Sequence, residues 1–125
     1  MIEEIHTENA PKAIGPYSQA IRAGDFIYIS GQIGVNPENG EVADGIENQT
    51  NQVLKNIQAI LKEAGTDFSK VIKFTIYLAS MDDFETVNEI YGSYLQKPYP
   101  ARATIEVSKL PKDVLVEIDA VVYDI

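Results

Sequence analysis

The sequence contains no cysteine, and His6 is its only histidine. Disulfide bonds, thiolate nucleophiles and thiolate metal ligands are therefore excluded. A site built from several imidazoles is excluded too, as is any catalytic triad that needs both a cysteine and a histidine. We interpret His6 as a strand or surface residue, because no motif surrounds it.

Basic residues and long apolar runs are also scarce. The chain has eight lysines and two arginines against 19 acidic residues, which gives a net charge of −9. An acidic surface repels phosphate backbones, so nucleic-acid binding is disfavoured. No run of about 18 apolar residues is present, and the N-terminus lacks a basic and then apolar leader. We expect a cytoplasmic protein without a membrane span.

The chain has 125 residues, which is the size of one ordinary domain. Apolar residues make up 45% and charged residues 23%, and these globular values argue against disorder. No linker, repeat or low-complexity stretch divides the chain. We therefore predict a single domain over residues 1–125.

Two amphipathic helices are predicted between strand-like segments. Apolar residues at three-to-four spacing follow Asp44, a candidate cap, and end before Gly65. Ser80 and Asp83 form a capping box for the second helix, which Pro98 ends. After a short N-terminal strand, the expected strands are Ser18–Ala23, Phe26–Ser30, Val71–Ala79, Ala101–Val107 and Val114–Tyr123.

These segments follow the order β-β-β-α-β-α-β-β. Helical crossovers between strands require some parallel pairing, and the two-residue link Gly24-Asp25 predicts an antiparallel hairpin. We predict an α+β fold, with a mixed sheet and both helices packed on one face. In the fourth strand, the residues expected on the buried side are Ile72, Phe74, Ile76 and Leu78.

The last predicted strand is apolar on both of its faces. Val116, Ile118 and Val122 have one parity, whereas Leu115 and Val121 have the other. A sheet face without helices needs another cover, and a second copy of the chain is the simplest one. We therefore predict a homo-oligomer.

Arg102 lies inside a strand-like segment rich in apolar residues. We assume that the last two strands pair as an antiparallel hairpin across residues 108–113. Arg102 then faces Asp119, and Thr104 faces Glu117, on one side of the sheet. The cluster is either a structural ion pair or a site, and the residues alone leave both open. In a site, Arg102 would bind a carboxylate with two parallel hydrogen bonds, and Glu117 could orient or deprotonate a water.

Four further positions can contribute to a pocket. Tyr17 follows the rigid turn at Pro16, while Ser30 and Gly31 end an apolar strand with a hydroxyl and a bare backbone that permits close ligand approach. Asn88 stands beside the apolar stripe of the second helix and needs a hydrogen-bond partner. Each also has a purely structural interpretation, as a packed tyrosine, a strand end or a core amide.

In combination, these segments resemble the Rid family, the reactive-intermediate deaminases also called YjgF-like proteins. The resemblance spans essentially the whole chain and implies a chorismate-mutase-like fold. It also implies a homotrimer with pockets in the clefts between subunits. The matching segments, in the family's order, are Ala13–Ala20, Ser30–Ile33, Tyr99–Thr104 and Leu110–Ala120.

The resemblance further implies a reaction, the hydrolysis of 2-imino acids and their enamine tautomers to 2-oxo acids and ammonia. Substrates of the 2-iminobutanoate and 2-iminopropanoate class are expected, without a metal or an organic cofactor. Arg102 is implied to bind the substrate carboxylate and Glu117 to hold the attacking water. The other implied pocket positions are Tyr17, Ser30, Gly31, Asn88 and Thr104, the last standing where many members have a cysteine.

Two other interpretations are weighed against this one. The first is a non-catalytic trimer that binds a small carboxylate metabolite or a partner protein. The second, RNA cleavage, is sometimes attached to this family. It finds little support in an acidic chain with a single histidine.

Overall fold

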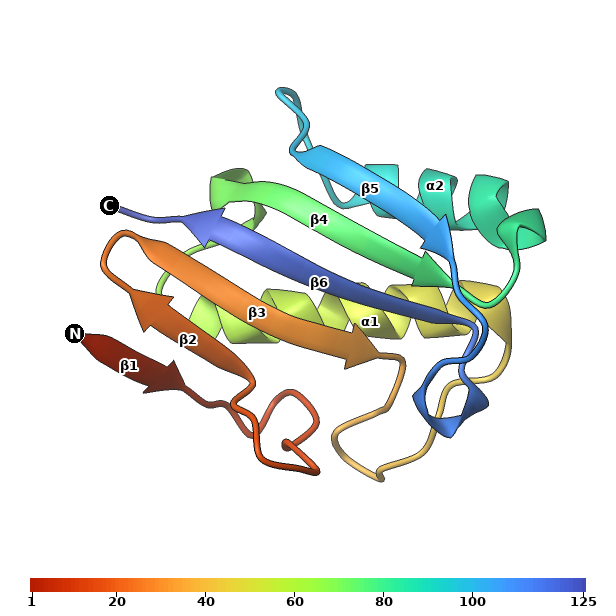
Figure 1. Cartoon of the computed structure of the whole chain (residues 1–125), viewed down its shortest axis with the longest axis horizontal. Helices are drawn as coiled ribbons and strands as arrows, with labels where there is room; N and C mark the ends of the chain where they lie inside the picture. The colour runs from red at the N-terminus through yellow and green to blue at the C-terminus, as the bar shows by residue number, and fades with distance from the viewer.

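The structure is a computed structural model that describes all of residues 1–125. Six strands form one mixed sheet in the order β1-β2-β3-β6-β4-β5, with both helices on the same face (Figure 1). The strands are β1 (Ile2–Ile5), β2 (Ala20–Ala23), β3 (Phe26–Ile33), β4 (Val71–Leu78), β5 (Ala101–Glu106) and β6 (Val116–Tyr123). The helices are α1 (Gly45–Glu63) and α2 (Phe84–Ser93), with single 3-10 turns at Phe68–Lys70, Met81–Asp83 and Pro111–Asp113. The predicted α+β fold is confirmed.

The N-terminal half of the sheet is antiparallel. β1 pairs with β2, β2 with β3, and β3 with β6. Ala23 lies opposite Phe26, so Gly24 and Asp25 form a two-residue hairpin loop. Gly24 has a φ of 63°, a backbone conformation that glycine adopts without strain. The hairpin predicted at Gly24-Asp25 is confirmed, although β3 runs on to Ile33.

Helix α1 covers the centre of the sheet, and its end is well defined. Gly65, with a φ of 80°, donates its N–H to the Lys62 carbonyl at 3.0 Å, and Thr66 donates to Leu61 at 2.9 Å. This pair of bonds is a Schellman motif, which satisfies carbonyls that the helix leaves free. Asp44 occupies the N-cap, but its side chain makes no capping hydrogen bond, so that detail of the prediction is wrong.

The core lies between the helices and the sheet. The buried apolar residues of α1 and the predicted inward residues of β4 meet there with the buried apolar residues of β6, and one β4 residue is an exception. Ile72 is 44% exposed, because the β4–β6 register shifts between Val71 and Lys73. The irregularity reverses the alternation at the start of β4, which sequence parity cannot foresee.

The predicted C-terminal hairpin is wrong. β5 pairs in parallel with β4, and β6 lies between β3 and β4, antiparallel to both. The crossover β4–α2–β5 takes one side of β4, which leaves the other side for β6. Residues 107–115 carry the chain across the end of the sheet (Figure 1), anchored by the buried Leu110.

The sheet face opposite the helices carries exposed aromatic rings. Tyr28 is 53% exposed, and Phe26 and Tyr123 pack against each other at a centroid distance of 5.3 Å while remaining exposed. This is the face that the sequence predicted to need a further cover. The homo-oligomer stays a prediction, because the structure holds one chain.

Candidate functional site

Arg102 lies on the helix-covered face of edge strand β5, beneath α2. Its register partner on β4 is the fully buried Phe74. Its Nη1 donates a hydrogen bond to Asn88 Oδ1 at 2.6 Å. Its guanidinium carbon lies 5.1 Å from the ring centre of Tyr91 and 5.6 Å from that of Phe84. These three α2 residues share one helix face, because they are spaced four and three positions apart.

A cavity of about 450 Å³ opens beside this arginine. No carboxylate lies within 4.0 Å of Arg102, since the ion pairs of the structure are His6–Glu8, Arg22–Asp124 and Lys109–Asp113. An arginine without a carboxylate partner in so acidic a chain keeps its full charge for an anion. The residues lining the cavity are Asn88, Tyr91, Gly92, Tyr99, Pro100 and Arg102.

Glu117 lies on the opposite, open face, on β6. Burial raises the pKa of its carboxyl above the usual glutamate value, and the nearby charge of Asp119 raises the pKa further. Its carboxylate rests against Gly31, where a Cβ would overlap it. The register of β3 against β6 shifts between Ile29 and Gln32. The bulge and the missing side chain together make room for a carboxylate whose raised pKa makes it a stronger base than an ordinary glutamate.

Asp119 is itself held by a neighbouring strand. Tyr77 of β4 donates its hydroxyl to Asp119 Oδ2 at 2.9 Å, and this bond raises the pKa of the Tyr77 phenol. The phenol therefore stays protonated at neutral pH and fixes Asp119 close to Glu117.

Tyr17 and Gly31 line a small cavity of about 60 Å³. Tyr17 is half exposed, and its hydroxyl oxygen accepts the Ile14 N–H at 3.4 Å. The Ser30 hydroxyl donates to the Ser18 carbonyl at 2.6 Å, so it ties β3 to the loop that carries Tyr17. Tyr17, Ser30, Gly31 and Glu117 thus gather at one place, as a half-site separate from Arg102.

The expected closeness of Arg102 and Glu117 within one chain is wrong. Glu117 pairs with Tyr77 and Arg102 with Phe74, and residues 74 and 77 of β4 point to opposite faces. The assumed hairpin placed them on one side. Thr104 shares the Arg102 face, with a buried hydroxyl that has no partner, and it does not line the cavity. Its role in substrate binding stays a prediction.

Tyr99, Phe84 and Tyr91 were not predicted from the sequence to belong to a site. Phe84 and Tyr91 were interpreted only as part of the apolar stripe of the second helix. Their spacing around Asn88 was the available signal, since it puts all three on one helix face. A parallel β4–β5 pair would then have placed Arg102 beneath that face.

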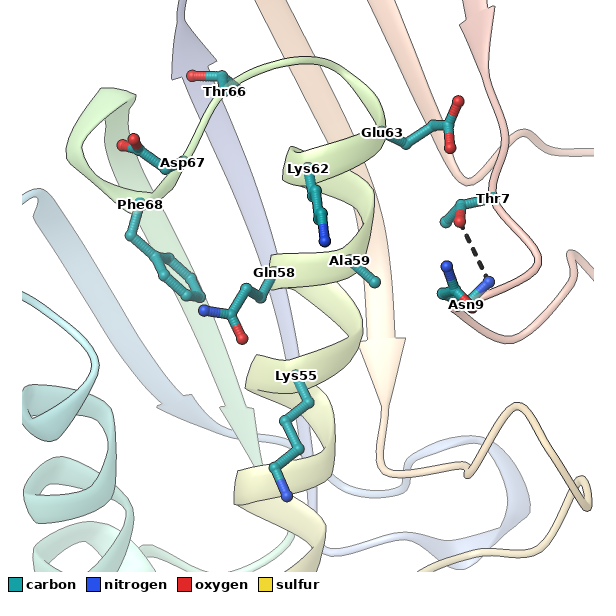
Figure 2. Close-up of a pocket in the computed structure, with 10 residues that line it drawn as sticks. All are labelled: Thr7, Asn9, Lys55, Gln58, Ala59, Lys62, Glu63, Thr66, Asp67 and Phe68. Atoms are coloured by element: carbon teal, nitrogen blue, oxygen red, sulfur yellow. Dashed lines mark hydrogen bonds between the residues drawn. The ribbon is translucent and has the colours of Figure 1, made fainter.

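A larger cavity lies elsewhere. Figure 2 shows this groove, of about 730 Å³, along the outer side of α1 between the 3-10 turn at Phe68 and the loop at Thr7 and Asn9. Two of its ten lining residues are hydrophobic, and its cations, Lys55 and Lys62, extend from the helix surface. It contains none of the predicted site residues, so size alone does not make it the site.

The chain offers neither a metal-ligand cluster nor a membrane-spanning helix. No group of three or more His, Cys, Asp or Glu residues is arranged to hold a metal ion. Neither helix has the length and hydropathy needed to cross a membrane. The absence of a cofactor stays a prediction.

The chain is similar in sequence and in structure to known proteins. Residues 7–124 match the family described as Endoribonuclease L-PSP. Human 2-iminobutanoate/2-iminopropanoate deaminase is 52% identical, over 94% of this chain and 86% of the relative. RidA from a Psychrobacter species has a TM-score of 0.95 and 44% identity, with 97% of this chain and 98% of that chain covered. The chain belongs to the Rid (RidA/YjgF) family.

A further solved structure of a Rid-family protein is described with a bound ligand. E. coli TdcF with bound serine has a TM-score of 0.95 and 38% identity, with 98% of this chain and 99% of that chain covered. At these identities the likeness extends beyond the fold to the family as a whole. A deaminase-family activity is therefore supported for this Rid protein.

Proposed function

We propose that this chain is a hydrolytic deaminase that converts 2-imino acids and their enamine tautomers to 2-oxo acids and ammonia. Substrates of the 2-iminopropanoate and 2-iminobutanoate size are proposed. One observation carries the proposal, namely Arg102 without a carboxylate partner at the wall of a cavity. The activity in the name of the human relative and the serine bound to TdcF support a small carboxylate-bearing molecule as the ligand.

The site is proposed to combine two copies of the chain. Arg102 and Glu117 lie on opposite faces of one sheet, so one chain cannot direct both at a small molecule. We propose a homotrimer in which the Arg102 cavity of one copy meets the Glu117 half-site of the next. The exposed aromatic rings on the open face, which favour burial, support assembly through that face.

In the proposed mechanism, Arg102 binds the substrate carboxylate through paired N–H donors. Glu117 accepts a proton from water as the water oxygen bonds to the carbon of the protonated C=N group. The carbon–nitrogen double bond becomes a single bond, which gives a tetrahedral intermediate. Glu117 returns the proton to nitrogen. As the C–N bond breaks, the hydroxyl oxygen forms the C=O bond and gives its own proton to Glu117, which releases it to solvent, so that ammonia leaves a 2-oxo acid. Imines hydrolyse unaided in water, so positioning can supply most of the acceleration.

The proposal is tested by generating the imine in place. An amino-acid oxidase acting on alanine supplies 2-iminopropanoate, and the rate of ammonia release is followed with and without the protein. We expect faster release with wild type and no acceleration with Arg102→Ala. Equal rates for Arg102→Ala and wild type would overturn the assignment.

The non-catalytic alternative is separated by the same assay. A binder would bind 2-oxobutanoate in calorimetry without changing the lifetime of the imine. RNA cleavage, suggested by the description of the family as an endoribonuclease, is opposed by the net charge of −9. Salt-sensitive RNA binding at neutral pH would reopen it. The cytoplasmic location stays a prediction.

A further inference from the structure

Arg102 is held in place by neutral groups alone. The ring centres of Tyr91 and Phe84 lie 5.1 and 5.6 Å from the guanidinium carbon of Arg102. Asn88 Oδ1 accepts a hydrogen bond from Arg102 Nη1 at 2.6 Å. All three holding residues come from α2. Arg22, the other arginine, is instead held by the carboxylate of Asp124 at 3.1 Å.

The two arrangements differ in what they leave for a ligand. A carboxylate partner compensates the charge of an arginine and competes with any anion that approaches. A ring attracts the guanidinium through its quadrupole and leaves the charge uncompensated. The guanidinium has five N–H groups and one hydrogen-bond acceptor in the structure, Asn88, so donors remain free for a carboxylate.

The Tyr91 ring is buried and packs against another ring of the core. Tyr91 is 6% exposed, and its ring meets that of Phe74 edge to face at 5.4 Å. Its hydroxyl is buried without a hydrogen-bond partner, and such a hydroxyl costs stability. The ring, rather than the hydroxyl, is therefore the part of Tyr91 that serves Arg102.

We propose that Tyr91 and Phe84 are positioning residues, which orient Arg102 toward a carboxylate while leaving its charge uncompensated. The two rings act through Arg102 and are not assigned contact with the substrate. That the carboxylate belongs to a 2-imino acid rests on the function proposed above.

The first experiment uses the ligand-free protein. The sequence has only two arginines, so a ¹⁵N spectrum of the guanidinium groups contains two sets of signals, with Arg22 as an internal control. We expect separate, slowly exchanging Nη signals for Arg102 in wild type. In Tyr91→Leu these signals should average, while those of Arg22 stay unchanged. Fast rotation of Arg102 in wild type, or no change in Tyr91→Leu, would overturn the proposal.

The second experiment measures the dissociation constant of 2-oxobutanoate by calorimetry. Tyr91→Leu should weaken binding by about tenfold through loss of the ring contact, whereas Tyr91→Phe, which keeps the ring, should bind like wild type. Phe68→Leu is the matched control, because Phe68 also packs on Phe74 but does not contact Arg102. Equal weakening in Phe68→Leu and Tyr91→Leu would show a merely structural role and overturn the proposal.

A variant that does not fold and a failure of the proposed function can each be told apart from a failure of the positioning role. If Tyr91→Leu does not fold, Phe84→Leu replaces it in both experiments, because Phe84 is only partly buried. If wild type neither binds 2-oxobutanoate nor speeds ammonia release, the proposed function fails. The ¹⁵N spectra then still decide whether the rings orient Arg102.

Discussion

Gly31 shows at the scale of one residue how the half-site around Glu117 is built. A Cβ at Gly31 would overlap the Glu117 carboxylate, which is the far end of a flexible side chain. At Gly34, by contrast, a Cβ would meet the backbone of Gln49 at 2.8 Å. The first glycine makes room for a functional group, and the second lets β3 approach α1.

We therefore expect Gly31→Ala and Gly34→Ala to behave differently. Gly31→Ala should displace Glu117 and abolish imine hydrolysis while costing less than about 1 kcal/mol of stability. Gly34→Ala should cost about 2 kcal/mol or more, because backbone must move. Urea unfolding and the ammonia assay measure both effects. A Gly31→Ala variant with wild-type activity would contradict the assigned position of Glu117.

Asp119 contributes, after burial, to the raised pKa of Glu117 and so to the pH range in which this proposed base can act. Glu117 must be ionised to accept a proton, so kcat/KM should fall as the pH falls through its pKa, which burial and Asp119 both raise. Asp119→Asn removes one negative charge and keeps an oxygen that can accept the Tyr77 hydroxyl. The acid limb should therefore move to lower pH.

The measurement is the pH profile of kcat/KM for both proteins. Glu63→Gln, which removes an exposed charge far from the site, is the control and should leave the limb in place. An acid limb that does not move in Asp119→Asn, or that moves to higher pH, argues against Glu117 as the base.

At the scale of elements, Arg22 joins three segments of the chain. Its Nη2 donates to the Ala64 carbonyl at the end of α1 at 3.2 Å and to Asp124 Oδ2 at 3.1 Å. These side chains are largely buried, so their hydrogen bonds are screened less than surface ones. The contact ties α1 to β2 and to the residue after β6.

Arg22→Ala should lower the free energy of unfolding by about 2 kcal/mol, because it leaves a largely buried carboxylate and a helix-end carbonyl without their charged partner. Urea denaturation measures the change. Lys62→Ala, at the same helix end but exposed, is the control and should change stability by less than about 0.5 kcal/mol. A similar small change in Arg22→Ala would show that this contact is as weak as a surface ion pair.

The elements were predictable from the sequence, but their pairing was only partly so. Helical periodicity and the turn at Gly24-Asp25 gave both helices and the first hairpin, because these signals are local. The partner of β5 depends on where α2 and β6 go, which no local pattern records. Arg102 and Glu117 were therefore found as candidate residues and misplaced relative to each other.

At the scale of the whole molecule, the two proposed half-sites face different directions. One sheet separates the Arg102 cavity from Glu117, and exposed rings cover part of the open face. A cyclic assembly would bring the helix-side edge of one copy to the open face of the next. Family resemblance, rather than residue spacing, supplied the homotrimer as the form of that assembly.

Mixing two inactive variants tests this arrangement most directly. Arg102→Ala and Glu117→Gln chains are unfolded together, refolded, and checked for mixed oligomers by differently tagged subunits and light scattering. If each site takes Arg102 and Glu117 from different copies, about one quarter of the sites in a random equal mixture are intact. The account predicts about that share of wild-type ammonia release. Mixed oligomers with no more activity than either variant alone would contradict it.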